Sequence, residues 1–344
     1  MRTDAQFSTG TAGAPDYPAM AVPVGERSSA SFRDYLAIAR LDHMTKHVFI
    51  VPGIILASVL RGSYLEIEPL LILLGLASAV AIAGGNYVIN EWLDREFDAF
   101  HPEKSKRSAV QRQLSPALIY LEYAVLIGGG LLLASLVNTA FLLTAAAFAL
   151  SGVFYNVRPF RTKDRAYVDV ISESINNPIR LTLGWTMVDP TTLPPASLFL
   201  AYWAAGAFLM GAKRLSEYRD IASRVGIDML CRYRRSFAGY TAESLTVSCF
   251  LYAMVSAFFL AVFLIRYRLE YLLAFPFIAG LFASYLWLSL LSNSVAQRPE
   301  RLFRSKRLML ASGVTAAVLL VTSFVNIPVL GTLSAPSFMP ASPR

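Results

Sequence analysis

Three oxygen-bearing side chains, Asn90, Asp94 and Asp98, recur every fourth residue directly after a long apolar run. At this spacing they form one polar stripe on a helix, roughly 12 Å long. Mg²⁺ is typically bound by one or two carboxylates together with substrate phosphates. The stripe predicts a Mg²⁺ site for a phosphorylated substrate, and the alternative is a solvated helix end.

A second polar cluster follows a later apolar run and contains Lys213, Arg214 and Glu217. Lys213 and Glu217 repeat the four-residue spacing of the first cluster, so they share a helix face. Because both clusters come at the same place relative to an apolar run, we expect two polar faces across one cavity. The alternative is a basic membrane-edge segment with an internal ion pair.

A third group of polar residues lies between these two clusters. Arg161 and Lys163 follow an apolar run, and they either bind phosphate or only mark the basic side of a membrane. The next apolar segment contains Asp169 and Arg180, which are eleven residues apart and therefore share a helix face. Ionisable groups within a membrane span are usually buried, paired and functional. The Asn-Asn-Pro run at 176–178 predicts a kink in this span.

The composition is that of a polytopic, all-α membrane protein. The chain has 344 residues, of which 55% are hydrophobic and 16% charged, with a mean hydropathy of +0.50. Apolar stretches of about 18 residues predict membrane helices. We predict nine: 47–60, 68–89, 115–136, 139–156, 168–188, 196–212, 245–265, 271–291 and 308–330.

Positive charge is distributed unevenly between the two sides of this topology. With the N-terminus in the cytoplasm, 26 of the 31 Lys and Arg residues lie on the cytoplasmic side. This is the positive-inside pattern of membrane proteins, so the net charge of +8 does not indicate nucleic-acid binding. We expect a plasma (inner) membrane protein whose active site faces the cytoplasm. Because the polar chemistry gathers at one membrane rim, an enzyme is favoured over a transporter.

The chain divides into a membrane domain and two tails. We expect residues 1–30 to be a disordered cytoplasmic tail, 31–333 to be the transmembrane domain, and 334–344 to be a C-terminal tail. Within the domain, residues 221–243 combine basic and apolar residues at helical intervals. They are expected to lie at the interface or to close over the cytoplasmic mouth. No pattern indicates an oligomeric state.

The stripe resembles a known family motif. Asn90-Glu91-x-x-Asp94-x-x-x-Asp98 is similar to the first aspartate-rich motif of the UbiA superfamily of intramembrane prenyltransferases, with Glu91 where the family usually has aspartate. Nine helices with polar loops after the second and sixth are also the family layout. The similarity covers roughly residues 35–330. It implies a UbiA-like bundle and Mg²⁺-dependent transfer of a prenyl group from an isoprenoid diphosphate donor to a lipid or aromatic acceptor.

One branch of the superfamily is similar in more places. The decaprenyl-phosphate phosphoribosyltransferases have comparable residues at Arg40-Leu41-x-x-x-x-Lys46-His47, at Asp169 and Arg180, and at Gly211-x-Lys213-Arg214-x-x-Glu217. That similarity implies a phosphoribosyl diphosphate donor and a polyprenyl phosphate acceptor. The Tyr155-x-x-x-Pro159-x-Arg161-x-Lys163 spacing is instead that of the aromatic and chlorophyll-type prenyltransferases. Both donors therefore remain open from the sequence.

The resemblance implies a role for each candidate residue. Asn90, Asp94 and Asp98 would hold Mg²⁺, and Asp169 or Glu217 would orient the acceptor beside the two catalytic aspartates. The residues implied to bind substrate are Lys46, Tyr155, Arg161, Lys163, Arg180, Lys213 and Arg214.

Overall fold

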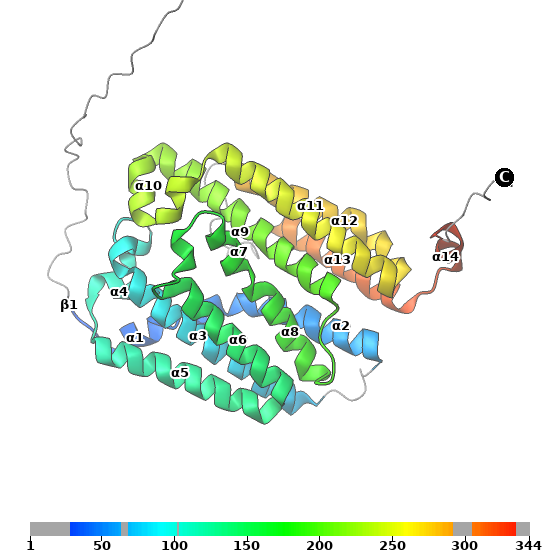
Figure 1. Ribbon diagram of the computed structural model, residues 1–344, viewed down its shortest axis with the longest axis horizontal. Helices are drawn as coiled ribbons and strands as arrows, with labels where there is room; N and C mark the ends of the chain where they lie inside the picture. The colour runs from blue at the N-terminus through cyan, green and yellow to red at the C-terminus, as the bar shows by residue number, and fades with distance from the viewer. Residues whose placement is uncertain (1–27, 63–67, 102, 292–304, 335–344) are drawn as a thin grey trace, which may run out of the picture.

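The computed structural model describes residues 28–62, 68–101, 103–291 and 305–334, which form an elongated helical bundle (Figure 1). The first half of the chain contains β1 (Ser28–Ser29), α1 (Phe32–Ile38), η1 (Leu41–Ile50), α2 (Val51–Arg61), α3 (Pro69–Asp98), η2 (Lys104–Lys106), α4 (Ser108–Gln111), β2 (Arg112–Gln113), α5 (Pro116–Val137) and α6 (Thr139–Asn156). The second half contains η3 (Thr162–Asp164), α7 (Val168–Ser174), α8 (Asn176–Val188), α9 (Ala196–Val225), α10 (Ile227–Tyr233), η4 (Arg235–Gly239), α11 (Ala242–Tyr267), η5 (Leu269–Ala274), α12 (Phe275–Leu290), α13 (Lys306–Phe324) and α14 (Pro328–Ser334).

Seven helices in the described residues are long and apolar enough to cross a membrane. They are α3, α5, α6, α9, α11, the η5–α12 segment and α13. Each overlaps one of the nine predicted spans, so the prediction of a polytopic helical membrane protein is confirmed. The other two predicted spans, 47–60 and 168–188, each fold as two shorter helices, η1 with α2 and α7 with α8. The count of nine and the orientation of the N-terminus stay predictions.

The break between α7 and α8 lies at Ile175. Pro178 has no N–H to donate to the carbonyl of Ser174, so the helical ladder is interrupted there. The Asn176 side chain donates instead to the carbonyl of Glu173, at 3.0 Å. The predicted kink at 176–178 therefore corresponds to a one-residue interruption at Ile175, whose backbone keeps helical angles (φ −57°, ψ −23°). It divides the predicted span into α7, which carries Asp169, and α8, which carries Arg180.

Small residues let the central helices approach one another closely. The Ser78 hydroxyl of α3 donates to the carbonyl of Gly130 on α5, at 2.7 Å. A Cβ atom at Gly53 of α2 would lie 2.0 Å from the carbonyl oxygen of Leu181 on α8. A Cβ atom at Gly184 of α8 would lie 2.1 Å from the carbonyl oxygen of Ile50. Close backbone packing of this kind is typical of helices that associate in membranes.

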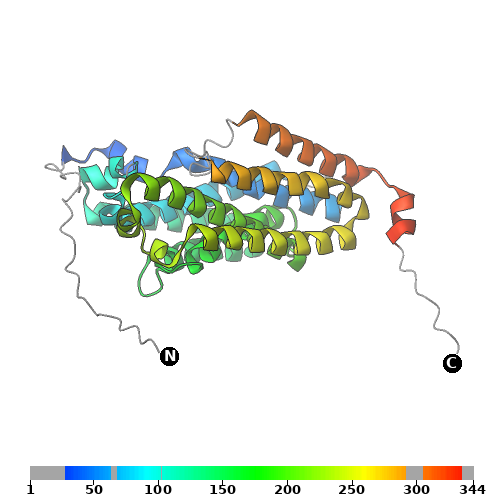
Figure 2. The same cartoon turned by 90° about the horizontal axis from the view of Figure 1, so that it is seen from above.

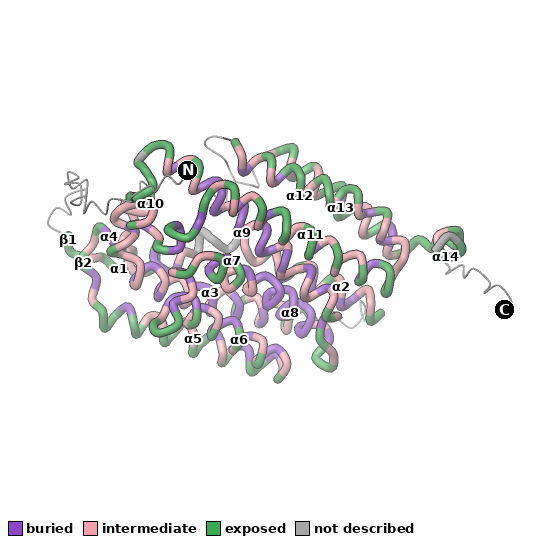
Figure 3. Tube along the Cα trace, turned by 45° about the horizontal axis from the view of Figure 1, so that its top comes forward, coloured by how far each residue is buried: buried purple, intermediate pink, exposed green. Residues whose placement is uncertain are grey.

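Burial separates an inner from an outer set of helices (Figure 3). Nearly all of α8 is buried, and one face of α3 is buried along most of its length. By contrast, α5, α11 and α13 expose most of their apolar side chains, as expected of helices facing lipid. Figure 2 shows α13 on the outer side of α12, with α14 beyond its end. The inner set surrounds the polar residues described below.

The polar connections gather at one end of the bundle, where α4 and α10 lie (Figure 1). Ser28–Ser29 pairs in parallel with Arg112–Gln113, so an ordered strand occupies the end of the predicted tail. Backbone pairing and a hydrogen bond from Arg112 to the Ser28 hydroxyl account for this difference. Nearly all of the two predicted tails lies outside the described residues, as does the basic segment 292–304.

Replacing Gly53 by alanine tests the close packing of α2 on α8. The new methyl group would overlap backbone atoms of Leu181 and Trp185, which cannot rotate away. We expect a destabilisation of about 1–3 kcal/mol, the usual effect of overpacking. Thermal unfolding in detergent should show a midpoint several degrees lower. Gly128→Ala on α5 is the matched control, because a Cβ there meets nothing within 4 Å. Equal midpoints for the two variants would contradict the packing.

Candidate active site

A polar cavity of about 290 Å³ lies among the inner helices. Its lining side chains come chiefly from η1, α3, α6, α8 and α9, and basic groups outnumber acidic ones by nine to three. The basic residues are Arg40, Lys46, Lys104, Arg107, Lys163, Arg180, Lys213, Arg214 and Arg234. The acidic residues are Glu91, Asp94 and Glu173. A cavity with this excess of positive charge attracts anions.

The predicted polar stripe of α3 points toward this cavity. Asn90 and Asp94 line it, and Asp98 lies one turn further along in a small adjoining pocket that Asp94 also lines. Asp94 pairs with Lys163 at 2.6 Å and with Arg161 at 2.9 Å. Asp98 accepts a hydrogen bond of 2.5 Å from Arg107. The three residues therefore lie on one face of α3, as expected, and their role as metal ligands stays a prediction.

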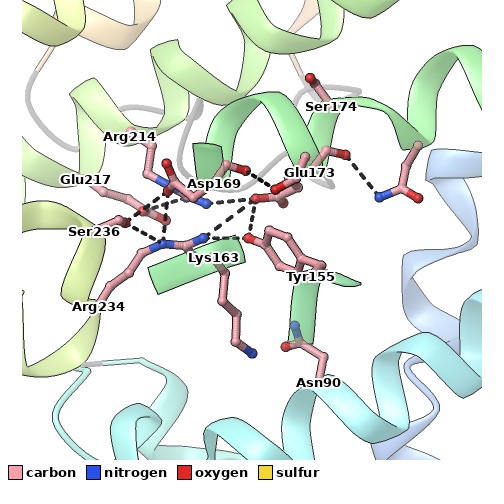
Figure 4. Close-up of polar contacts among 12 residues, drawn as sticks. Asn90, Tyr155, Lys163, Asp169, Glu173, Ser174, Arg214, Glu217, Arg234 and Ser236 are labelled. Atoms are coloured by element: carbon pink, nitrogen blue, oxygen red, sulfur yellow. Dashed lines mark hydrogen bonds and ion pairs between the residues drawn. The ribbon is translucent and has the colours of Figure 1, made fainter. Parts of the chain in front are cut away.

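Asn156 at the end of α6 joins the stripe to the basic segment. Its amide oxygen accepts hydrogen bonds from Asn90 at 2.6 Å and from Lys163 at 2.8 Å. In Figure 4 the Lys163 side chain extends toward Asn90 and away from the carboxylate cluster. Burial lowers the pKa of Lys163 to about 8, although the neighbouring Asp94 carboxylate opposes this shift. A bound anion would favour the protonated form of this lysine.

The stripe has the chemistry of a magnesium site. In the described part of the chain, no group of three His, Cys, Asp or Glu residues is placed to hold a metal. Mg²⁺, however, typically takes only one or two carboxylates and completes its coordination with substrate phosphates and water. Asp94 and Asp98, with the amide oxygen of Asn90, supply suitable hard oxygen ligands beside the basic cavity. In the present structure basic side chains pair with the two aspartates. If a phosphorylated ligand took over those basic side chains, the three residues could hold the metal.

A buried ionic cluster forms the opposite wall (Figure 4). Its centre is Arg214 of α9, whose side chain is 1% exposed. The guanidinium group contacts Asp169 at 3.1 Å, Glu173 at 2.7 Å and Glu217 at 3.1 Å. Three carboxylates around one guanidinium group satisfy its donors in three directions, as burial requires.

The segment between α9 and α11 is bound into this cluster. Arg234 contacts Asp169 at 3.4 Å, and the Ser236 hydroxyl donates to the same carboxylate at 3.0 Å. The Tyr240 hydroxyl donates to the other oxygen of Asp169 at 2.5 Å. The Arg234 side chain also donates to the hydroxyl of Tyr155. Residues 227–240 therefore pack against the bundle through buried polar contacts.

The structure places Asp169 and Glu217 away from the cavity lining. Asp169 is fully buried, and its oxygens already accept from Arg214, Ser236 and Tyr240. Glu217 is occupied by Arg214. Both were expected to orient an acceptor; in this structure their oxygens contact residues of the wall, and the acceptor role stays a prediction. Glu173, an ionisable residue of the same predicted span to which no specific role was given, lines the cavity.

The remaining predicted residues divide between the two pockets. Tyr155, Lys46, Arg180 and Lys213 line the cavity, whereas Arg161 lies in the small adjoining pocket. The Tyr155 hydroxyl donates to Glu173 at 2.8 Å. The structure thus brings residues of the three polar clusters together around one cavity, although Asn90 and Lys213 are 123 residues apart in the chain.

Four basic residues of the cavity were not among the predicted site residues: Arg40, Lys104, Arg107 and Arg234. Burial lowers the pKa of Lys104 to about 8, and its amino group contacts the hydroxyl of Tyr233. Tyr233 also packs edge-on against His101, at 4.4 Å between ring centroids. These contacts join the segment after α3 to α10. The sequence signal was only a basic loop after each polar cluster, which does not show that the two loops meet.

Comparison with known proteins places the chain in a family. The model of the UbiA prenyltransferase family matches residues 50–312. Protoheme IX farnesyltransferase of Alkalihalophilus pseudofirmus is 26% identical over 242 residues, covering 67% of this chain and 75% of that protein. The enzyme of the same name from Bordetella avium is 26% identical over 262 residues, covering 74% and 83%.

The fold is also that of solved structures. The structure of a UbiA homolog from Archaeoglobus fulgidus bound to GPP and Mg²⁺ superposes with a TM-score of 0.64 at 18% identity. The match covers 85% of this chain and all of that one. The bundle and its polar cavity define an integral membrane enzyme. The chain belongs to the UbiA prenyltransferase family, and it is a transferase of prenyl groups, as the aspartate-rich motif predicted.

Replacing Arg214 by glutamine tests the ionic wall. The change would leave three carboxylates around a neutral amide, and removing one partner of a buried ion pair typically costs about 3–5 kcal/mol. We expect poor recovery of folded protein and a markedly lower unfolding midpoint in detergent. Arg224→Gln is the control, because it breaks the ion pair of Asp220 with an arginine whose side chain is 55% exposed, where about 1 kcal/mol or less is expected. Similar effects of the two changes would show that the cluster does not carry stability.

Proposed function

We propose that this protein is a Mg²⁺-dependent intramembrane transferase that ionises an isoprenoid diphosphate in the basic cavity and passes the prenyl group to an acceptor. The observation that carries the proposal is the cavity itself. One wall offers Asn90, Asp94 and Asp98 as oxygen ligands, and the other surfaces supply excess positive charge. A metal-bound diphosphate is complementary to both features.

The basic side chains would neutralise and orient the diphosphate. Lys163 lies between Asp94 and Asn156, and Lys213 lines the cavity from α9. Bound by Asp94, Asp98 and Asn90, Mg²⁺ would stabilise the charge of the departing pyrophosphate. As the diphosphate binds, Lys163 would transfer its contacts from Asp94 to phosphate oxygens. The carboxylate would then be available as a metal ligand.

The reaction begins when the bond between the first prenyl carbon and the diphosphate oxygen breaks. The bonding electrons leave with the oxygen, where fixed positive charge stabilises them. The allylic cation that remains must be kept from water. Phe49, Phe148 and Tyr155 line the cavity and would exclude water, and aromatic ring faces also attract cations. The acceptor then supplies an electron pair to this carbon and loses a proton.

Relatives indicate which substrates to test first. The Archaeoglobus fulgidus homolog was solved with GPP or DMAPP and Mg²⁺, which supports an isoprenoid diphosphate donor. The relatives named protoheme IX farnesyltransferase support a farnesyl donor and a haem acceptor. A second candidate is phosphoribosyl transfer to a polyprenyl phosphate. Arg40 and Lys46 favour this second candidate, because both line the cavity and both belong to the segment that is similar to the decaprenyl-phosphate phosphoribosyltransferases.

We further propose the predicted topology for the described bundle. It has nine membrane-crossing segments, with η1–α2 and α7–α8 as the two broken ones, and a cytoplasmic N-terminus. The uneven distribution of Lys and Arg supports this orientation, with the cavity facing the cytoplasm across the plasma (inner) membrane. The catalytic domain is then residues 31–333, and residues 227–240 cover its cytoplasmic end.

Replacing Asp94 or Asp98 by asparagine tests the proposed metal site. Each change keeps the side-chain size but removes a charged ligand, so we expect at least a 100-fold lower rate of Mg²⁺-dependent product formation. The purified protein should be incubated with Mg²⁺ and two donor panels: prenyl diphosphates with aromatic or haem acceptors, and phosphoribosyl diphosphate with polyprenyl phosphate. The mass of the lipid product identifies the donor.

Glu96→Gln is the matched control, because Glu96 lies on the same helix with its side chain 75% exposed. We expect its rate to equal that of the unmodified protein. Full activity of both aspartate variants would contradict the metal site. A phosphoribosylated product would retain the metal site but replace the proposed donor.

A further inference from the structure

The cavity contains a second basic region that the diphosphate site does not use. Arg180 of α8 lines the cavity and is 7% exposed. Its Nε atom has no hydrogen-bond partner, and Nη1 makes only a 3.4 Å contact with the carbonyl of Asn176. Within the described residues, no carboxylate lies at ion-pair distance from it, in contrast to Arg214 with its three.

This arginine lies deeper in the bundle than the metal stripe. Its guanidinium carbon is 4.9 Å from the ring centroid of Phe148. The Asn86 amide donates to the carbonyl of Phe148 at 3.0 Å, so these residues share one layer. Asn86 precedes Asp94 by two helical turns, about 12 Å. Phe148 precedes Asn156, which contacts the stripe, by the same number of residues.

Other polar atoms in this layer also have unused hydrogen-bonding capacity. The amide oxygen of Asn86 and Nδ1 of His47 are buried without partners. Lys46 lies over the ring of Tyr87, at 5.4 Å, and lines the same cavity. Both Lys46 and Arg180 therefore present charge to the cavity without a carboxylate partner among the described residues.

Glu173, the acidic cavity residue on the preceding helix α7, already has partners. One of its oxygens accepts hydrogen bonds from Arg214 and Tyr155. A cation within a membrane bundle is unfavourable unless it is paired. The two carboxylates of the proposed metal site, Asp94 and Asp98, lie about two and three helical turns from this layer, so the donor's diphosphate would be held toward the other end of the cavity. A second anion in the cavity would supply the missing partner.

We propose that Arg180, assisted by Lys46, binds an acidic oxygen group, a carboxylate or a phosphate, on the acceptor substrate. This subsite rests on the proposed function, because it places the acceptor beside the donor held at the stripe. The anion would accept hydrogen bonds from the free face of the guanidinium group. The acceptor class is thus a lipid-soluble acid, and its reactive carbon or oxygen lies between the two subsites.

Acceptor binding by full-length protein in nanodiscs tests this subsite directly. Two pairs of probes separate the sources of the acid: protoheme IX with its dimethyl ester, and undecaprenyl phosphate with undecaprenol. In the unmodified protein, we expect the acid of one pair to bind at least tenfold more tightly than its neutral counterpart. Arg180→Gln should abolish that preference, and Arg180→Lys should keep part of it. Affinity for geranyl diphosphate with Mg²⁺ should stay within twofold in both variants.

Arg165→Gln is the matched control, because it removes an exposed positive charge and should leave both affinities unchanged. Retained acid preference in Arg180→Gln, or none in the unmodified protein, would overturn the subsite. If Arg180→Gln lowered the affinity for geranyl diphosphate as much as the affinity for the acid, Arg180 would instead belong to the donor site. Asp94→Asn separates this result from failure of the proposed function. If that variant keeps Mg²⁺-dependent donor binding, the metal site fails, whatever Arg180 does.

Discussion

The contacts of the Arg214 guanidinium group hold the architecture of the cavity together. Charged groups inside a membrane bundle must be compensated, and Arg214 compensates carboxylates from α7 and from its own helix, α9. Asp169 extends the network to the segment after α9, through Arg234 and Tyr240. Because α7 is too short to cross the bilayer, these contacts fix its position beside α9. The wall opposite α3 depends on them.

In the cavity, by contrast, basic groups outnumber the acidic groups that could compensate them. Nine basic and three acidic side chains line the space, so part of the charge compensation is left to the substrate. Asp94 and Asp98 are paired with Lys163, Arg161 and Arg107 in the present structure. Binding of a metal diphosphate is then an exchange of partners, in which phosphate takes the cations and the metal takes the carboxylates. In such an exchange each charged group leaves one partner of opposite charge for another. No buried charge is then left unpaired, which would be costly in a low-dielectric site.

The long apolar spans and the α3 stripe could be predicted from the sequence because local periodicity determines them. The prediction that the Asn90 and Lys213 clusters face one cavity also agrees with the geometry, because both follow an apolar span at the same end. The division of the spans at 47–60 and 168–188 into shorter helices could not be predicted in the same way. Each folds as two helices, and the close contact between Gly53 and Leu181 that holds them together joins residues far apart in the chain.

The roles of individual charges depended on tertiary contacts that no spacing reveals. Asp169 was expected to orient an acceptor, but its observed partners are Arg214 and Arg234, which come from elements more than 40 residues away in the chain. Arg234 itself lies in a loop whose composition indicated only an amphipathic, basic helix. The sequence therefore shows which span ends carry charged residues. Which of these residues line the cavity and which hold its wall together is decided by tertiary contacts.

A structure of the protein with Mn²⁺ and a prenyl thiodiphosphate that ionises only slowly would show whether Asp94 and Asp98 hold the metal. Mn²⁺ gives an anomalous signal and binds the same oxygen ligands as Mg²⁺. We predict a metal peak about 2.1 Å from carboxylate oxygens of Asp94 and Asp98, with Lys163 contacting the diphosphate instead of Asp94. A metal bound elsewhere, with Asp94 still paired to Lys163 and Arg161, would contradict the exchange of partners on which the account rests.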